Sequence, residues 1–137
     1  MFKRFRRLRI NPLFRDLIRE TSLSVNDFIY PLFVVEGRGV KKEIASMPGV
    51  FQMSVDEILK ECAAVINLGI KAVILFGIPS VKDSVGSDAL SDEGIIAVTL
   101  RAIKDKFPNL LVVTDLCFCE YTPRTLRHPR SRPSDGR

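Results

Sequence analysis

Cysteine is scarce in this sequence, and long apolar runs are missing from it. Three cysteines, Cys62, Cys117 and Cys119, are too few for the disulfide framework of a small secreted protein. No apolar run approaches the roughly 20 residues that a membrane-spanning helix needs, and the arginine-rich start is not followed by an apolar segment with a small-residue cleavage site. We therefore expect a cytoplasmic protein with reduced thiols and no membrane partner.

Acidic residues are nearly absent from the two ends, which carry the net charge of +5. Residues 1–9 hold five cations and no acid, and residues 123–137 hold five arginines against Asp135. The 113 residues between them have 11 basic and 15 acidic side chains, so a nucleic-acid-binding face across the domain is not supported. A basic RNA-binding tail at 123–137 remains as an alternative.

The first 26 residues interleave arginines with large apolar side chains. Such a segment is too polar for a core and too apolar for a free tail. It suits an arm that lies on a partner surface, and the alternative is a frayed basic terminus.

Further along, apolar strands alternate with amphipathic helices. The expected strands are 28–35, 72–78 and 110–118. One expected helix follows a capping box at Ser54–Glu57, ends at Gly69 and buries Cys62, and the other spans about 93–107. Pro31 predicts an edge, a start or a bulge for the first strand. This alternation predicts an α/β fold with a parallel sheet.

Chemistry gathers where the third expected strand ends. Because strand side chains alternate, Asp115, Cys117 and Cys119 are predicted to project from one face, at the sheet edge where catalytic groups of parallel α/β folds lie. Two thiolates are good zinc ligands, but a zinc site needs three or four donors and the chain offers no obvious third. From the spacing alone, Cys117 and Cys119 could be two buried strand cysteines, or they could belong to a small thiolate metal-binding module. The polar loop 80–92 is either an anion cradle or an ordinary solvated loop.

Several stretches together resemble one family over residues 1–122. They are the arginine-rich 4–9, DFIYPLFVVEG at 27–37, SMPGV at 46–50, the segment 76–86 and TDLCFCEYT at 114–122. This text is similar to that of the porphobilinogen synthases (5-aminolevulinate dehydratases). The resemblance implies a (β/α)₈ TIM barrel, of which 27–122 would be the first part with about three strands. It also implies that residues 1–26 are an arm embracing a neighbouring subunit, usually within a homo-octamer.

The resemblance also implies a reaction, a hydro-lyase step of heme biosynthesis. Family members condense two 5-aminolevulinate molecules to porphobilinogen with loss of water, through Schiff bases to lysines on later strands. Asp115 matches the active-site carboxylate, and Cys117 and Cys119 match the first two of three zinc cysteines; magnesium is a second metal that the family allows. None of the chain's lysines matches a Schiff-base position. We therefore expect the chain alone to be inactive, and to aggregate or be degraded.

The resemblance breaks after Thr122. The third zinc cysteine should fall at position 127, which is Arg127. For suitably chosen codons of residues 123–130, a one-base shift of the reading frame yields Gly-His-Cys-Gly-Ile-Leu, the text that the family has there. Residues 123–137 are thus predicted to be an out-of-frame tail, which resequencing the gene across the Thr122 codon would test.

Overall fold

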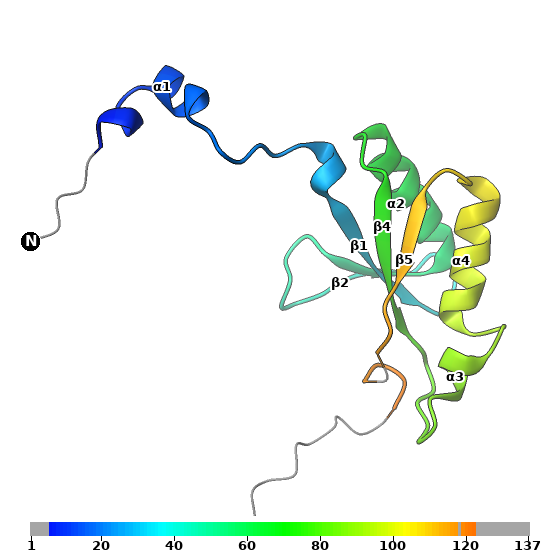
Figure 1. Cartoon of the computed structure of the whole chain (residues 1–137). Coiled ribbons are helices and arrows are strands. Elements are labelled where there is room, and N and C mark those ends of the chain that lie inside the picture. Colours follow the sequence, from blue (N-terminus) through cyan, green and yellow to red (C-terminus); the bar gives the residue numbers. More distant parts are fainter. Residues whose placement is uncertain (1–5, 118, 123–137) are drawn as a thin grey trace, which may run out of the picture.

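A mostly parallel sheet organises the chain (Figure 1). The computed structural model describes residues 6–117 and 119–122. In this part of the chain the sheet has the order β2-β3-β1-β4-β5. Its strands are β1 (Ile29–Val35), β2 (Lys41–Glu43), β3 (Phe51–Met53), β4 (Ala72–Ile78) and β5 (Leu111–Thr114).

The register confirms the expected α/β architecture. Strand β1 pairs in parallel with β4 along its whole length, with Ile29 opposite Ala72 and Val35 opposite Ile78. Strand β5 continues the parallel sheet on the other side of β4, and β3 lies parallel to β1. Only β2 is antiparallel, to β3. The three-residue strands β2 and β3 were not expected, because segments so short show no hydrophobic periodicity.

Two helices cover one face of this sheet. Helices α2 (Val55–Asn67) and α4 (Ile95–Lys106) lie on the same side of the strands (Figure 1), and the short α3 (Ser87–Leu90) precedes α4. Between helices and sheet lies a core of fully buried side chains: Leu32, Val34, Ile58, Cys62, Val73, Leu75 and Ile103. Full burial of one large aliphatic side chain contributes about 1.5–3 kcal/mol, so this layer is the main source of cohesion. Cys62 is buried as expected.

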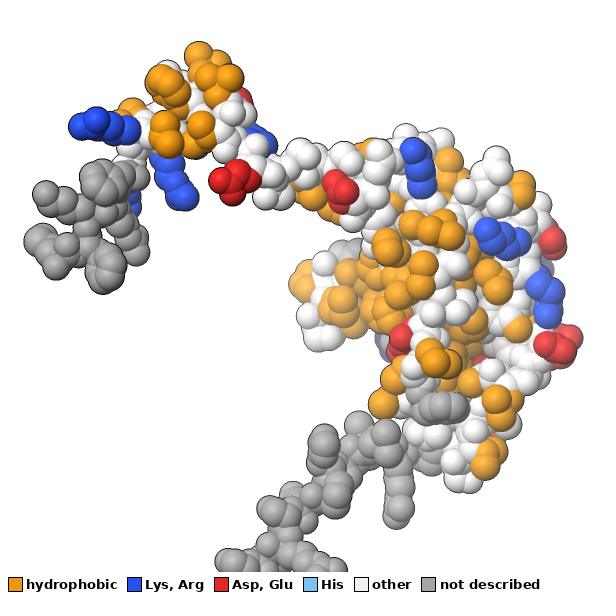
Figure 2. Space-filling view, in the orientation of Figure 1, with side chains coloured by type: hydrophobic (Ala, Val, Ile, Leu, Met, Phe, Trp, Pro, Cys, Tyr) orange, Lys and Arg blue, Asp and Glu red, His pale blue; other side chains and the backbone are white. Residues whose placement is uncertain are grey.

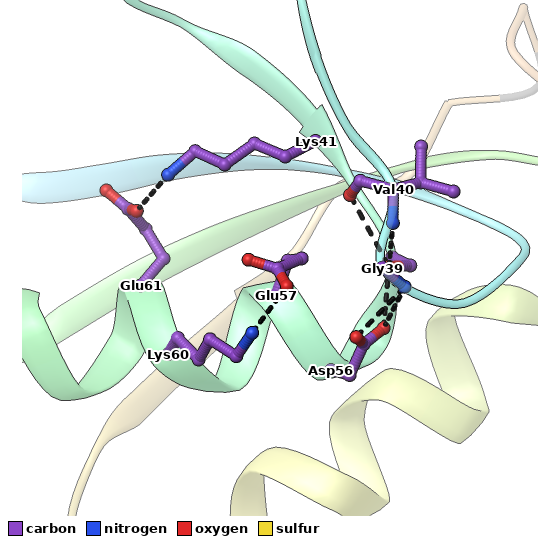
Figure 3. A network of polar contacts seen from close by, with 8 residues as sticks. Gly39, Val40, Lys41, Asp56, Glu57, Lys60 and Glu61 are labelled. Carbon is purple, nitrogen blue, oxygen red and sulfur yellow. Dashed lines mark hydrogen bonds and ion pairs between the residues drawn. The ribbon is translucent and has the colours of Figure 1, made fainter.

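Helix α2 begins and ends where the sequence predicts, but its N-terminus is held differently. Ser54 is the N-cap residue, yet its hydroxyl makes no capping bond and instead accepts the N–H of Val40 at 2.9 Å. Asp56 binds the Gly39 N–H with both carboxylate oxygens, at 3.1 and 3.0 Å (Figure 3). The predicted capping box is therefore wrong, because the Ser54 hydroxyl is hydrogen-bonded to the backbone of Val40 and not to the first turn of the helix. At the other end Gly69 has φ +84°, as a glycine after a helix should.

Figure 3 also shows how acidic side chains of α2 meet lysines. Glu61 pairs with Lys41 of β2 at 3.4 Å, and Lys60 pairs with Glu57 at 2.5 Å. Hydrogen bonds from Ser54 and then from the Gly39 N–H lower the pKa of Asp56, so it stays ionised at the N-terminal, positive end of the helix. This network ties the β2–β3 hairpin to α2.

Pro31 lies in a strand with neighbours on both sides, so the prediction of an edge strand is wrong for β1 as a whole. Strand β3, however, pairs only with Phe33 and Val34. The first half of β1, which contains Pro31, has β4 as its single partner strand in the described residues. A proline is tolerated there because one side of the backbone has no ladder to complete.

The N-terminal segment extends away from the sheet (Figure 1). It contains α1 (Pro12–Leu17) between two short 3₁₀ turns, Arg7–Arg9 and Val25–Asp27. Every residue from 6 to 29 is exposed, including the large apolar ones. The predicted arm therefore has no core of its own.

Hydrophobic side chains also gather over the strands of the sheet (Figure 2). Phe33 of β1 and Phe76 of β4 stack there, with ring centroids 5.2 Å apart, and both remain partly exposed. None of the helices in the described part is long and apolar enough to cross a membrane. The predicted tail 123–137 lies outside the described residues.

Candidate functional site

The segment that carries Asp115, Cys117 and Cys119 is not a strand. Strand β5 ends at Thr114, four residues before the predicted end, and its ladder with β4 stops at Leu75. The Asp115 N–H still donates to the Leu75 carbonyl at 3.4 Å, after which the chain leaves the sheet and turns. The prediction that all three side chains share one strand face is therefore wrong.

Tyr121, on the turn that follows β5, packs back toward β4. It is 7% exposed, and its hydroxyl lies where a side chain on Gly77 would project, beside Ile95 and Ile96 of α4. This contact joins residues 44 positions apart and could not be predicted from the sequence of the strand alone.

Cys117 and Cys119 nevertheless stay together. The Cys119 N–H donates to the Cys117 sulfur at 3.4 Å, with Cys117 half-buried and Cys119 exposed. The hydrogen bond with Cys117 and the charge of that thiol raise the pKa of Cys119, because two adjacent thiolates repel. The two sulfurs form a pair at the carboxyl end of β5.

Asp115 and Cys117 face one cavity of about 350 Å³. Its lining also includes Asp88 after β4, Ile96 of α4 and Tyr121. Cys119 is not in the lining. The structure therefore brings Asp115 and Cys117 to a common space and places the second thiol just outside it.

Glu120 is an acidic residue of this region that was not predicted from the sequence. Burial raises its pKa, the nearby charge of Asp115 raises it further, and Lys82 acts in the opposite direction. The only sequence signal was its position beside Cys119.

The loop after β4 is internally bonded. Asp83 accepts the N–H groups of Val85 and Ser87, both at 3.0 Å, and the Ser87 hydroxyl also donates to it. The bond from the Ser87 hydroxyl, and then those from the loop N–H groups, lower the pKa of Asp83. The same bonds occupy amides that an anion cradle would need. The loop, which contains the unexpected α3, favours the alternative of an ordinary polar loop.

With this geometry in place, comparison with known proteins is decisive. The family model for delta-aminolevulinic acid dehydratase matches residues 2–126. The chain belongs to the delta-aminolevulinic acid dehydratase family. The resemblance to porphobilinogen synthases stated above is confirmed, since the two names denote one enzyme.

Relatives within the delta-aminolevulinic acid dehydratase family are similar over most of this chain. The Helicobacter pylori dehydratase is 58% identical over 123 residues, which are 89% of this chain and 38% of that protein. The Bacillus subtilis dehydratase is 48% identical over 121 residues, 88% of this chain and 37% of that protein. The crystal structure of the Toxoplasma gondii dehydratase, in complex with the reaction product porphobilinogen, matches 90% of this chain with TM-score 0.80 and 30% identity, and 35% of its own chain is covered. The chain thus spans well under half the length of these relatives.

Enzymes of this family depend on metal ions, and the described residues are incomplete as a metal site. Among residues 6–117 and 119–122 there is no group of three or more His, Cys, Asp or Glu side chains placed to hold a metal ion. Two adjacent thiols are present, and a zinc site needs at least one donor more. The described residues therefore do not make a complete zinc site, and we assign no reaction step to a metal.

Proposed function

We propose that this chain is the N-terminal part of a delta-aminolevulinic acid dehydratase, the hydro-lyase that condenses two molecules of 5-aminolevulinate to porphobilinogen in heme biosynthesis. The observation that carries the proposal is the 58% identity to the Helicobacter pylori dehydratase over 89% of the chain. The likeness to the porphobilinogen-bound Toxoplasma gondii dehydratase supports it independently, through the fold.

The fold assigned to the whole enzyme is a (β/α)₈ TIM barrel, in which β1, β4 and β5 would be consecutive strands. Their parallel order with α2 and α4 on one face suits the wall of such a barrel. The stacked Phe33 and Phe76 would then face the barrel interior, where packed side chains from other strands would cover them.

Asp115 is the catalytic residue that we assign within this chain. It follows β5 directly, at the carboxyl edge where active sites of barrels lie, and it faces the 350 Å³ cavity. A carboxyl group in that place would assist proton transfer or orient the amino group of the substrate.

Cys117 and Cys119 are assigned as two of the thiolate ligands of a zinc ion whose further donors lie outside the described residues. The bond from the Cys119 N–H to the Cys117 sulfur, and the interaction between the two thiols, support this assignment. Zinc with an open coordination position would polarise the substrate carbonyl when bound. Magnesium remains a second metal for the whole enzyme, with no residue of this chain assigned to it.

We assign the exposed arm a role in oligomer contacts, in which it lies on a neighbouring subunit of a homo-oligomer. The proposed assembly is the octamer expected from the family resemblance, and the proposed location is the cytoplasm. Its apolar side chains, among them Phe14 at 51% and Leu17 at 81% exposure, are not covered by the described residues. A neighbouring subunit would remove them from water.

A chimera tests the function. Residues 1–122 of this chain replace the matching part of the Helicobacter pylori dehydratase, and porphobilinogen formation from 5-aminolevulinate is measured. We expect an active enzyme, whereas the 137-residue chain alone forms no product because its lysines match no Schiff-base position. A folded chimera without product would reject the proposal.

Matched variants of the chimera test the assigned residues. Asp115→Asn should lower kcat by about 10²–10⁴, the usual contribution of a positioned acid or base. Asp105→Asn, on the exposed side of α4, changes the same charge and should leave kcat unchanged. Cys117→Ser should lower the zinc content of the purified chimera, and an unchanged zinc content would remove Cys117 from the ligand set.

A further inference from the structure

Tyr121 is the only strongly buried side chain in the turn that follows β5, as far as that turn is described. Its hydroxyl lies over Gly77 of β4, the strand next to β5. A Cβ placed on Gly77 would come within 2.7 Å of the Tyr121 hydroxyl and of Ile96, and within 3.0 Å of Ile95. The missing side chain of Gly77 therefore leaves room for the Tyr121 side chain beside Ile95 and Ile96 of α4.

The backbone of Tyr121 is held at a second point. Its carbonyl accepts the N–H of Asp83 at 3.2 Å. Asp83 is itself fixed, because its carboxylate receives the N–H groups of Val85 and Ser87 within the loop after β4. Side chain and carbonyl thus anchor one residue to the strand and to the loop that leaves it.

The rest of the turn is held weakly. Among the described residues between Thr114 and Tyr121, the Asp115 N–H donates to the Leu75 carbonyl and the Cys119 N–H to the Cys117 sulfur, both at a long 3.4 Å. Neither would by itself fix a segment that has left its sheet. Tyr121 nevertheless lines the same cavity as Asp115 and Cys117.

We propose that Tyr121 is a positioning residue, whose buried side chain over Gly77 and whose carbonyl bond to Asp83 fix Asp115 and Cys117 at the carboxyl end of the sheet. It touches no reacting atom in this role. The inference rests on the proposed function only where it concerns catalysis, because the anchoring itself is a property of the turn.

The three cysteines provide an internal scale for the test. In the 137-residue chain, the rates of alkylation by iodoacetamide are measured for each cysteine at one fixed pH by mass spectrometry. Solvent access decreases from Cys119 to Cys117 to the fully buried Cys62, which should react slowest. Because the raised pKa of Cys119 lowers its thiolate fraction, each variant is compared with the wild-type rate of the same cysteine. In Tyr121→Ala the Cys117 rate should rise by about tenfold and approach that of Cys119, while Cys62 stays protected. Tyr121→Phe, which keeps the ring, should change the Cys117 rate by less than about twofold.

Two controls separate positioning from general stability. Tyr30→Ala removes the chain's other tyrosine, which is half-buried at the far end of β1, and should leave the ratio of Cys117 to Cys119 rates unchanged. Asp83→Pro removes the N–H that the Tyr121 carbonyl accepts, and should raise the Cys117 rate above that in Asp83→Ala, which keeps it. An equal rise of Cys62 and Cys117 in Tyr121→Ala, or no difference between the two Asp83 variants, would overturn the proposal.

The catalytic consequence is measured in the chimera. Tyr121→Ala should lower kcat by about tenfold or more, because a small misplacement of a catalytic group is costly, while Tyr121→Phe keeps most of the activity. One outcome is a faster Cys117 alkylation in Tyr121→Ala together with a chimera that forms no product even without this substitution. That outcome would reject the proposed function but not the anchoring by Tyr121. An active chimera whose kcat does not respond to Tyr121→Ala would reject the positioning role instead.

Discussion

At the scale of single residues, the three cysteines show how environment sets the chemistry of one side-chain type. Cys62 lies on the inner stripe of α2 with no exposed surface, and burial raises its pKa to about 11. Cys117 and Cys119 lie beyond the end of the sheet and influence each other. The buried thiol therefore behaves as a small apolar group, and the pair at the turn is available for chemistry.

The raised pKa of Cys62 predicts a loss of stability in alkali. A group whose pKa in the folded state exceeds its ordinary value of 9.0 stabilises the fold fully below pH 9, and this stabilisation is lost as pH rises through about 11. Two pKa units correspond to about 2.7 kcal/mol. At pH 7 Cys62→Ala should lower the free energy of unfolding by about 1 kcal/mol, through lost burial and a small cavity.

Urea unfolding of the two proteins at pH 7 and at pH 11 checks this. The wild type should lose stability faster than Cys62→Ala, so the difference between them shrinks or reverses at high pH. Tyrosines and lysines titrate in both proteins and cancel in that comparison. A difference that stays constant between the two pH values would contradict the buried, neutral thiol.

The cysteines also mark how far the sequence predicts a site. The helical period correctly buries Cys62, because that signal lies within one element. The arrangement of Cys117 and Cys119 was predicted from an extended strand that does not exist. The chain turns instead, and Tyr121 of that turn packs over Gly77, a contact between residues far apart in sequence that no local pattern predicts.

At the scale of elements, a similar division holds. Strand β4 has the predicted bounds and α2 begins and ends at the predicted residues, because apolar pattern and terminal signals agree there. The prediction of a capping box was wrong because the Ser54 hydroxyl accepts the Val40 N–H. This tertiary contact cannot be predicted from the residues around Ser54. The β2–β3 hairpin was missed since its strands are too short to show a period.

Gly94, the residue before α4, has a role that its backbone angles do not reveal. Its φ of −63° suits any residue, but a Cβ there would overlap the carbonyl of Asp88 and lie 3.0 Å from that of Ser91. Gly94→Ala should therefore push α4 away from α3 and lower the free energy of unfolding by about 3 kcal/mol, the upper end for overpacking.

Gly49→Ala is the matched control for this prediction. At Gly49 a Cβ would meet no atom within 4 Å, but φ is +80°, so the cost is the strain of a left-handed residue, about 1 kcal/mol. Urea unfolding gives both values, and hydrogen exchange at the Val98 amide, which donates to the Gly94 carbonyl, reports the first turn of α4. Equal costs, with the Val98 amide equally protected in both variants, would rule out the steric role of Gly94.

At the scale of the whole molecule, the described chain has two parts with opposite character. The sheet and its two helices share a buried core, whereas residues 6–29 are exposed throughout. The sheet itself keeps apolar side chains uncovered on β1 and β5, among them Ile29 at 53% and Leu111 at 58% exposure. In relatives more than twice as long, further chain is available to cover such surfaces.

This contrast predicts the order of proteolysis. In a dilute solution of the 137-residue chain, trypsin should cleave after Arg15 and Arg19 at least about tenfold faster than after Lys60, because cleavage within α2 requires the helix and its core contacts to open first. Lys60 is a fair reference, since its side chain is 69% exposed and only its backbone is protected. In the chimera, a neighbouring subunit covering the arm should slow cleavage after Arg15 as protein concentration rises, and leave Lys60 unaffected. Equal rates at Arg15 and Lys60 in the dilute chain would show that the arm packs on its own sheet, and a chimera without concentration dependence would show that no neighbour holds it.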